Sequence, residues 1–499
     1  MSADSNFFAD MFQPSGLQPT PEQEAIIYSR DNPLKVMAFA GTGKTATLVM
    51  RANHCLHQRI LYLAFNKSVE EEAQHRFSSN VTARTVHALA YSKIGRKFKL
   101  GKLSPYQVSK QLDLPYYEAL LTMRTLENWL ISGDSLLTGT HIAKDFLRKH
   151  KGSGAGALLD AARKLWRIME SAQSRDIPMT HSGYLKIFQL SQPDLPYDLL
   201  MVDEAQDTNG VTHALVMNQS SHEVLFVGDE KQSIYGWRGA VDALTNLNAP
   251  AMYLTNSFRF GPEIAKVANT ILRSYFNEKM ELKGLGLSQV GMVDITKPYT
   301  IITRTNAGLF KKAWEASRAS KIYITGCTDA GDLPIFSTLM DVFYLWKQEY
   351  HNIKDPEVKC FDTFEQACVL AESECLDPEY TVALRIVNEY GITLPQRINE
   401  VKAAMVIQPE LAQVRFTTAH RAKGLEWGQV QIGEDFPKLF DKAGHKVRIG
   451  YGDDEIEPQE INLLYVTATR AKKQLQLNPD LRRLMAEDFL ASKHPADPV

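Results

Sequence analysis

The sequence has no uninterrupted apolar segment that approaches the roughly 20 residues needed to cross a bilayer. Its first residues, Met1–Pro14, mix Asp with Phe and lack a basic flank followed by an apolar run, so the pattern predicts no secretory signal. The five cysteines are odd in number and fall at none of the spacings typical of zinc sites or disulfides. These absences predict reduced thiols, no membrane partner and a cytoplasmic location, at the nucleoid if the source is prokaryotic.

A strong excess of charge of either sign is also missing. The chain has 56 Lys and Arg against 58 Asp and Glu, which gives a formal net charge of −2. A protein coated in basic surface is therefore excluded, and any nucleic acid must meet a local basic groove. With 499 residues, 44% of them hydrophobic and 23% charged, the chain has a globular composition and is long enough for roughly three or four folding units.

A glycine-rich turn follows an apolar run near the start of the chain. Residues 38–45 read Ala-Phe-Ala-Gly-Thr-Gly-Lys-Thr, between the strand pattern 36–39 and the helix pattern 46–52. A strand, a turn and a helix in this order direct backbone N–H groups at an anion, and Lys44 suits the β- and γ-phosphates. The strict pattern has glycine at position 38, and we interpret Ala38 as a tolerated variant. The candidate nucleotide-binding residues of this loop are Gly41, Thr42, Gly43, Lys44 and Thr45, with Thr45 also a candidate Mg²⁺ ligand.

Polar residues follow or precede several predicted strands. Gln23, in a helix pattern started by Pro19 and Pro21, could offer its amide to an adenine edge or could be a solvated surface residue.

Strand patterns at 60–65 and 81–87 alternate with helix patterns, which predicts a parallel α/β sheet.

An apolar strand pattern ends in adjacent acids at Asp203 and Glu204. In an ATPase, Asp203 would hold Mg²⁺, and Glu204 would orient and deprotonate the attacking water. The next strand pattern, 223–227, leads into a loop with the phosphate-sensing candidate Gln232 and two aromatics, Tyr235 and Trp237. Aromatics on a glycine-flanked loop offer flat faces for base stacking.

Residues 91–195 have a mainly helical pattern with two basic clusters. The first comprises Lys93, Arg96, Lys97, Lys99 and Lys102, and the second comprises Arg148, Lys149 and Lys151. Either cluster could contact phosphates or could form a solvated helix face, and the sequence leaves both possibilities open.

The order of these motifs resembles superfamily 1 DNA helicases of the UvrD/Rep/PcrA type, in a compact form similar to the helicase core of the eukaryotic F-box DNA helicases. Further family motifs follow at 256–259, 303–306, 417–427 and 464–471. The resemblance implies an α/β fold with two RecA-like phosphate-loop NTPase lobes on parallel sheets, each carrying a mainly helical inserted subdomain. The implied ranges are 1–90 and 196–250 for lobe 1, 91–195 for its insertion, 251–347 and 412–490 for lobe 2, 348–411 for a small second insertion, and 491–499 for a flexible tail.

The resemblance also implies individual roles. Arg259 and Arg470 would be arginine fingers at the γ-phosphate, Phe258 would stack on adenine, and Glu426 would bind the ribose. Gln232 and Arg238 would link the γ-phosphate to the aromatic loop. The implied DNA contacts are Asn66, Thr85, His87, Tyr235, Trp237, Arg304, Thr418 and His420. The aromatic before Asn66 is placed differently from that of the family, so a stacking role for Phe65 stays open.

The combined interpretation is an ATP- and Mg²⁺-dependent translocase on single-stranded DNA and a 3′–5′ DNA helicase. Its substrates would be single strands and single-strand/duplex junctions, and the protein would be a monomer without partners. Two alternatives remain. The motor could mainly strip proteins such as recombinase filaments from DNA, or it could be a nucleic-acid-sensing ATPase subunit of a defence complex.

Overall fold

The computed structural model describes residues 18–143, 146, 154–171, 176–219, 222–236, 244, 247–327, 333–372, 376, 378–452 and 454–493. These residues form two compact units. Unit 1 comprises the described residues up to Leu100, together with Leu130–Ser135 and His181–Arg259. Unit 2 comprises Gly101–Trp129, Leu136–Thr180 and the described residues from Phe260 onward.

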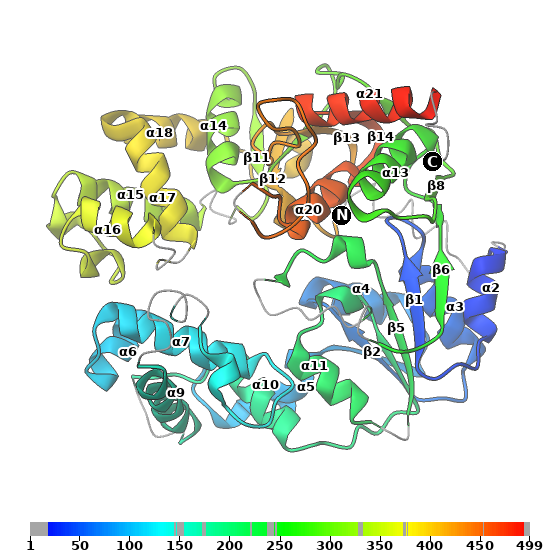
Figure 1. Cartoon of the computed structure of the whole chain (residues 1–499), viewed down its shortest axis with the longest axis horizontal. Helices are drawn as coiled ribbons and strands as arrows, with labels where there is room; N and C mark the ends of the chain where they lie inside the picture. Colours follow the sequence, from blue (N-terminus) through cyan, green and yellow to red (C-terminus); the bar gives the residue numbers. More distant parts are fainter. Residues whose placement is uncertain are drawn as a thin grey trace. The chain divides into compact units, whose positions relative to one another are not determined.

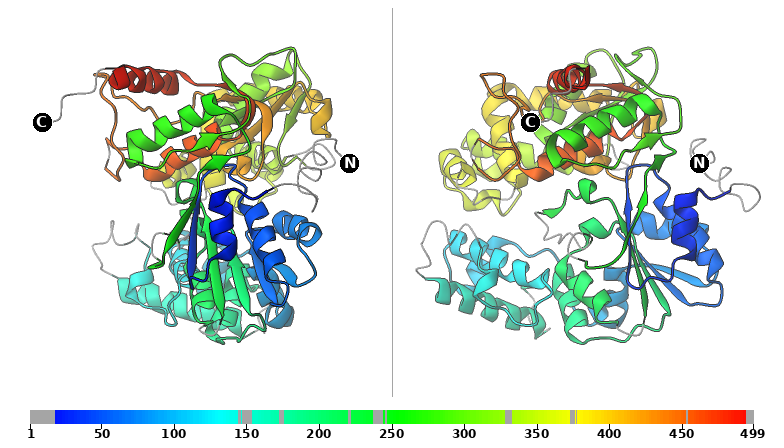
Figure 2. Two further views of the ribbon diagram at one scale, coloured as in Figure 1. Left: turned by 90° about the vertical axis from the view of Figure 1, so that its right-hand side faces the viewer. Right: turned by 45° about the vertical axis from the view of Figure 1, so that its right-hand side comes forward.

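Unit 1 is built on a six-stranded parallel sheet in the order β3-β2-β4-β5-β1-β6, whose strands lie side by side in both views of Figure 2. Its strands are β1 (Leu34–Ala38), β2 (Ile60–Ala64), β3 (Val81–Thr85), β4 (Leu199–Val202), β5 (Glu223–Gly228) and β6 (Ala251–Leu254) (Figure 1). Strands β2 and β4 are buried at every position, as expected for a parallel sheet covered on both faces. The parallel arrangement brings the carboxyl ends of all six strands to one edge, where ligands bind in such sheets.

Helices cover this sheet. They are α2 (Pro21–Tyr28), α3 (Lys44–His54), α4 (Lys67–Arg76), α5 (Val86–Lys93), α10 (His181–Leu190) and α11 (Gly210–Met217). The start of α2 is fixed by a capping box. The Thr20 hydroxyl accepts from the Gln23 N–H at 3.3 Å, and the Gln23 side-chain oxygen accepts from the Thr20 N–H at 3.0 Å, with Pro21 at the first helical position. The cap therefore also orients the Gln23 side chain.

Unit 2 contains a second six-stranded sheet, in the order β11-β12-β10-β13-β14-β9, with parallel pairing throughout. Its strands are β9 (Gln289–Val290), β10 (Tyr299–Thr303), β11 (Ile322–Ile324), β12 (Val414–Thr418), β13 (Trp427–Ile432) and β14 (Ala471–Gln476). The accompanying helices are α13 (Pro262–Phe276), α14 (Asn306–Ser317), α19 (Ala419–Ala422), α20 (Pro458–Ala468) and α21 (Pro479–Lys493). The expected α/β class with two parallel sheets is confirmed.

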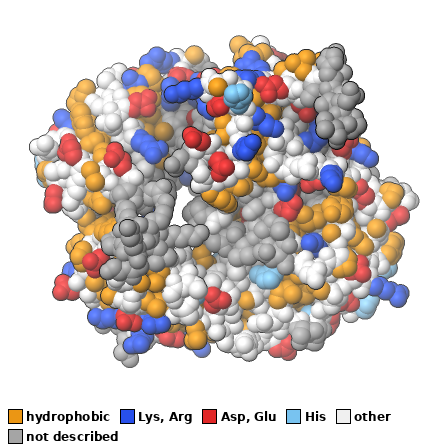
Figure 3. Space-filling view, in the orientation of Figure 1, with side chains coloured by type: hydrophobic (Ala, Val, Ile, Leu, Met, Phe, Trp, Pro, Cys, Tyr) orange, Lys and Arg blue, Asp and Glu red, His pale blue; other side chains and the backbone are white. Residues whose placement is uncertain are grey.

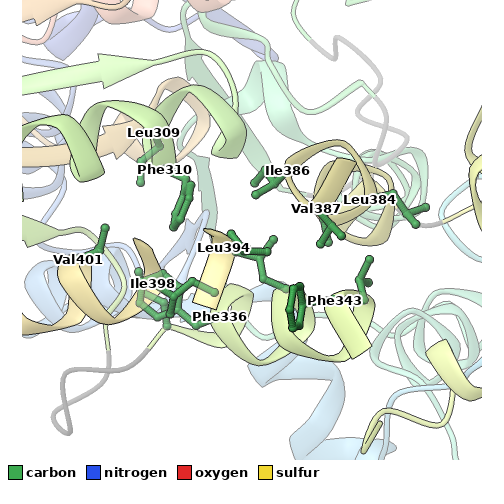
Figure 4. Packing of buried hydrophobic residues seen from close by; sticks show 14 of the residues in the cluster. Leu309, Phe310, Phe336, Phe343, Leu384, Ile386, Val387, Leu394, Ile398 and Val401 are labelled. Atoms are coloured by element: carbon green, nitrogen blue, oxygen red, sulfur yellow. The ribbon is translucent and has the colours of Figure 1, made fainter. Parts of the chain in front are cut away.

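The remaining helices of unit 2 form two groups. The first is α6 (Pro105–Leu112), α7 (Tyr116–Leu130, whose last residue belongs to unit 1) and α9 (Ala155–Glu170), and the second is α15 (Pro334–Trp346), α16 (Phe364–Glu372), α17 (Pro378–Tyr390) and α18 (Leu394–Ala404). In Figure 4, side chains of the second group converge, with Phe336 and Phe343 of α15 facing Leu394 and Val387. These buried side chains form one apolar core together with residues of β10 and β12.

The structure bears on three of the expected boundaries. Strand β6 pairs with β1, so residues 251–254 belong to the first sheet, and the segment of unit 2 that carries the second sheet begins at Phe260 rather than at 251. Helix α15, which begins at Pro334 and so lies before the expected start of the second insertion at 348, shares one apolar core with α17, α18 and the second sheet. Helix α21 continues to Lys493, into the segment expected to be a tail from 491.

The first insertion is also shorter than expected. Both α5 and α10 belong to unit 1, and only Gly101–Trp129 and Leu136–Thr180 of the range 91–195 are separate from it. The second basic cluster at 148–151 lies outside the described residues. No helix in the described ranges combines the length and apolar character that crossing a membrane requires. The four described cysteines are free thiols in this structure.

Candidate functional site

The glycine-rich loop at the end of β1 adopts a conformation that only glycine allows easily. Gly41 and Gly43 have φ angles of +75° and +80°. A Cβ atom on Gly41 would lie 2.5 Å from the Ser257 hydroxyl oxygen and 2.7 Å from Cβ of Arg259. The Phe258 N–H donates to the Gly41 carbonyl at 2.9 Å. The loop is therefore closed tightly against residues 257–259, and its shape fits a phosphate cradle at the N-terminus of α3.

Lys44, the first residue of α3, pairs with Glu204, which follows β4. Their Nζ and Oε1 atoms are 3.0 Å apart. Burial alone would lower the pKa of Lys44, but the carboxylates of Glu204, Asp203 and Asp229 raise it above its ordinary value. Lys44 is therefore held in its charged form. A bound phosphate would replace Glu204 as the ion-pair partner of Lys44.

Asp203 is buried and held on both carboxylate oxygens. Oδ1 accepts from the Glu204 N–H at 2.8 Å, and Oδ2 accepts from the Tyr62 hydroxyl at 2.5 Å. Burial, and then the charge of Glu204, raise the pKa of Asp203, whereas Lys44 and Tyr62 act in the opposite direction. Burial also raises the pKa of Tyr62 well above its ordinary value, so its phenol stays a donor. The Asp203 carboxylate and the hydroxyl of Thr45, the second residue of α3, are ligand types that fit Mg²⁺, which keeps waters and takes phosphate oxygens as further ligands.

A chain of hydrogen bonds links the candidate base to the candidate phosphate sensor. The Gln206 amide donates to Oε2 of Glu204 at 2.5 Å, and its oxygen accepts from the Asp229 N–H at 3.0 Å. The Gln232 amide then donates to Oδ2 of Asp229 at 2.7 Å. Glu204 itself has a φ of +48°, an uncommon and costly conformation for a residue other than glycine. The carboxylate of Glu204 is thus fixed by Lys44 on one side and Gln206 on the other.

Gln23 and Phe258, the two residues predicted to contact adenine, lie beside Gly43 of the phosphate loop. A Cβ atom on Gly43 would lie 3.4 Å from Nε2 of Gln23 and 3.5 Å from the Phe258 ring. The Gln23 amide also donates to the Thr47 hydroxyl at 3.2 Å. The Phe258 side chain is 36% exposed, so one part of the ring is accessible to a ligand. Both residues therefore border the phosphate loop within unit 1.

Glu22 anchors this arrangement. Its carboxylate accepts from the Thr255 N–H at 2.9 Å, from the Thr255 hydroxyl at 2.5 Å and from the Asn256 amide at 3.2 Å. The start of α2 is thus tied to the segment that carries Phe258.

The aromatic pair at the exposed end of the sheet is formed by Phe65 and Tyr235. Their ring centroids are 5.4 Å apart with an interplanar angle of 25°, so the rings stack. Phe65 is 36% exposed. The structure thus associates Phe65 with a predicted DNA-stacking residue, although its own role was left open. Trp237 and Arg238 lie outside the described residues.

Two predicted DNA contacts cap helices at the carboxyl ends of β2 and β3. The Asn66 side chain accepts from the Val69 N–H at 3.0 Å at the start of α4. The Thr85 hydroxyl accepts from the Ala88 N–H at 3.1 Å at the start of α5. Their helix N-termini favour nearby anions such as phosphates.

The third predicted contact in this region, His87, is a neutral residue at pH 7. Burial, and then the neighbouring His181, lower its pKa to about 4. A contact with phosphate would therefore be a hydrogen bond rather than an ion pair.

In unit 2, the predicted DNA contact Arg304 faces Glu460 of α20. Its Nε and Nη2 atoms donate to the two carboxylate oxygens at 2.6 Å and 2.5 Å. Its guanidinium is thus committed to a bidentate ion pair in this structure. Thr418 is buried and His420 is half-buried at the end of β12.

The predicted finger Arg470 is 2% exposed. Its guanidinium donates to the Val466 carbonyl at 2.9 Å, to the Leu425 carbonyl at 3.4 Å and to the Thr469 hydroxyl at 3.3 Å. The predicted ribose ligand Glu426 pairs with Lys472 at 3.2 Å. Arg470 therefore also has a structural role within unit 2.

Of the predicted residues in unit 1, the structure connects Lys44, Asp203, Glu204 and Gln232 through ion pairs and hydrogen bonds, and it places Gln23, Phe258 and Arg259 against Gly41 and Gly43 of the phosphate loop. It adds residues that sequence reasoning missed, which are Glu22, Tyr62, Gln206 and Asp229. Gln206 and Asp229 stand inside motifs already singled out, so their position was a usable signal. Tyr62 is an aromatic inside an apolar strand, where nothing distinguishes a functional phenol from a core residue.

Comparisons with known proteins agree with this geometry. A model of the AAA domain matches residues 22–238, and a model of the UvrD-like helicase C-terminal domain matches residues 364–478. The chain is 33% identical to F-box DNA helicase 1 of Gallus gallus over 96% of this chain and 50% of that protein, and 30% identical to F-box DNA helicase protein 1 of Schizosaccharomyces pombe over 94% and 58%. It is 27% identical to ATP-dependent DNA helicase PcrA of Bacillus subtilis over 53% of this chain and 40% of that protein.

The chain thus spans about half the length of the curated relatives it matches. The AAA-domain match spans β1 to β5 of the first sheet, and the UvrD-like match spans β12, β13 and β14 of the second sheet, which identifies the sheets as RecA-like lobes. The chain thus carries segments similar to the AAA domain and to the UvrD-like helicase C-terminal domain, and it resembles UvrD-like DNA helicases over nearly its whole length.

Proposed function

We propose that this protein is an ATP-dependent translocase on single-stranded DNA that moves 3′ to 5′ and unwinds duplexes at single-strand/duplex junctions. The observation that carries the proposal is the ion pair of Lys44 and Glu204, beside the buried Asp203, at the end of a glycine-rich loop. This is the arrangement that phosphoryl transfer to water requires. The names of the relatives, which are DNA helicases, support the choice of DNA as the track.

In the proposed reaction, Lys44 and the loop N–H groups bind and orient the β- and γ-phosphates. Mg²⁺, when bound by Thr45 and Asp203, neutralises phosphate charge. Glu204 accepts a proton from the attacking water, and Arg259 stabilises charge on the γ-phosphate. Arg470 and Glu426 keep their predicted roles at the nucleotide as part of this proposal.

Gln232 is proposed to couple ATP hydrolysis to the contact with DNA. The amide of Gln232 is joined to Glu204 through Asp229 and Gln206, and Tyr235 follows it by three residues. A change at the γ-phosphate would therefore reach an aromatic that stacks with Phe65. Asn66, Thr85, His87, Arg304, Thr418 and His420 are proposed to contact the strand backbone, with Arg304 released from Glu460 when it does so.

The first prediction tests the track and its polarity. A duplex with a 3′ single-stranded tail should be unwound with ATP, whereas the matched duplex with a 5′ tail should stay paired. A fluorescence strand-displacement assay, run beside an ATPase assay with and without oligonucleotide, measures both properties.

The outcomes separate the alternatives. Stimulated ATP turnover without displacement of either duplex, but with removal of a bound recombinase, would replace unwinding by protein stripping. ATP turnover that is stimulated by oligonucleotide, without strand displacement or recombinase removal, would support the alternative of a nucleic-acid-sensing ATPase.

The second prediction concerns Tyr62. Replacing Tyr62 with Phe removes the hydroxyl that holds Oδ2 of Asp203, so the carboxylate loses its fixed orientation. The Mg²⁺ concentration that gives half-maximal ATP turnover should rise about tenfold, the usual effect of losing a group that orients a metal ligand. A Mg²⁺ titration of fluorescent nucleotide binding should show the same shift without turnover.

Tyr275→Phe is the matched control. It removes another buried phenol, whose hydroxyl donates to the Leu439 carbonyl at 3.5 Å in unit 2. The control should leave the Mg²⁺ titration unchanged. An unaltered titration in Tyr62→Phe would show that Tyr62 only fills space in the sheet.

A further inference from the structure

A long segment of unit 1 and its continuation contains no acidic residue. Between Glu72 and Asp113 the sequence has 40 residues with eight Lys or Arg and no Asp or Glu. The whole chain has a net charge of −2, and basic and acidic side chains are interspersed on the face drawn in Figure 3. The segment is therefore a strong local exception to the charge balance of the protein.

The structure shows which of these charges are used internally. Arg76 pairs with Glu72, and Arg84 pairs with the buried Glu70. Lys93, Arg96 and Lys97 are exposed, at the end of α5 and in the short 3₁₀ helix η1 (Gly95–Lys97). Among the described residues, none of these three side chains has a carboxylate partner within ion-pairing distance. Three cations thus gather on one short stretch without local neutralisation.

An aromatic group borders these cations. Tyr91 is 42% exposed and lies one helical turn beyond His87 on α5, so the two side chains share a face. The Tyr91 and His87 rings both contact the Tyr184 ring edge-on, with centroids 6.1 Å and 6.2 Å apart. The Tyr184 hydroxyl is in turn 3.0 Å from Nδ1 of His181. Tyr91 is therefore a supported ring with an accessible part beside a cluster of positive charge.

The same helix, α5, carries both the predicted DNA contacts at its start and Lys93 at its end. Helix α5 starts at the Thr85 cap and carries His87 in its first turn. Its eight residues span about 12 Å at 1.5 Å per residue. At about 3.4 Å per nucleotide, this length corresponds to three or four nucleotides beyond Thr85.

We propose that the α5–η1 surface, defined as Tyr91, Lys93, Arg96 and Lys97, binds single-stranded DNA and extends the strand path beyond Thr85 and His87. The cations neutralise successive phosphates, and Tyr91 offers a stacking face to an unpaired base. This inference rests on the proposed function, because it lengthens the same DNA site. It assigns three residues of the first basic cluster, Lys93, Arg96 and Lys97, to phosphate binding, which the sequence left open.

The test uses the variant Lys93→Ala/Arg96→Ala/Lys97→Ala in the full chain. Affinity for single-stranded oligonucleotides of increasing length is measured by fluorescence anisotropy at several salt concentrations. In the variant, the length at which affinity reaches its plateau should fall by three or four nucleotides. At low salt, affinity for long oligonucleotides should fall about tenfold, and the slope of log affinity against log salt should decrease by about 2, at roughly 0.7 for each lost phosphate contact.

Lys279→Ala/Lys283→Ala/Lys297→Ala is the matched control, since it removes three exposed charges from unit 2. Thermal unfolding of both variants checks that they are folded. A variant that behaves like this control overturns the inference, while oligonucleotide binding by the unaltered protein preserves the proposed function. Loss of affinity for blunt duplex alone, with single-strand binding intact, also overturns it.

Discussion

Glu204→Gln should reduce ATP turnover by about a thousandfold, within the range measured when a general base is lost. Glutamine keeps the size of the side chain and can still meet the Gln206 amide through its oxygen, but it cannot accept the proton of the attacking water. Nucleotide should still bind, because Lys44 loses its carboxylate partner and is freed for the phosphates. Steady-state and single-turnover hydrolysis, beside fluorescent nucleotide binding, measure the two properties separately.

The matched control for this variant is Glu230→Gln. Glu230 lies two residues before Gln232 and pairs with Lys231 at 2.8 Å, so its replacement removes a nearby charge that the proposed chemistry does not use. Its turnover should stay close to that of the unaltered protein. Hydrolysis that persists in Glu204→Gln would assign the base to another group. Single-stranded DNA binding without nucleotide should be retained in both variants.

Arg259→Ala should lower kcat by about a hundredfold with a small change in KM. An arginine that stabilises charge developing on the γ-phosphate acts mainly in the transition state, and losing one such donor costs about that much. The position fits this role, because the Arg259 Cβ lies where a side chain on Gly41 would be, at the edge of the phosphate loop. A full kinetic titration with ATP separates kcat from KM.

Arg273→Ala is the control, since Arg273 is a partly exposed arginine on α13 that pairs with Asp488. A rise in KM with unchanged kcat in Arg259→Ala would make Arg259 a nucleotide-binding residue instead. Arg470 is a poorer choice for this test. Its buried guanidinium donates to the Val466 carbonyl, and leaving such acceptors without a donor would also destabilise unit 2.

The phosphate loop and the acidic pair were predictable because local sequence determines them. A glycine with positive φ, a lysine at the start of a helix and acids after an apolar strand are properties of short segments. Strand β6 shows the limit of such reasoning. Its residues 251–254 have no pattern that assigns them to one sheet, and the pairing with β1 is a long-range property.

Helix α15 shows a related limit. Its apolar pattern suits either a lobe or an insertion, and in the structure its side chains pack in one core with α17, α18 and residues of β10 and β12. Tyr62 and Glu22 were missed because their partners Asp203 and Thr255 are far away in sequence. Side-chain pairs across strands leave no signature in a single chain without knowledge of the fold.

The short connection after β6 has a mechanical consequence. Strand β6 is held in register against β1, and the Phe258 N–H is bonded to the Gly41 carbonyl of the phosphate loop. The segment of unit 2 that carries the second sheet begins only two residues later, at Phe260. A single residue, Arg259, therefore separates the backbone that is bonded to the phosphate loop from the part of the chain that continues into the second sheet. A shift of the loop backbone on nucleotide binding would reach that part of the chain through this one residue.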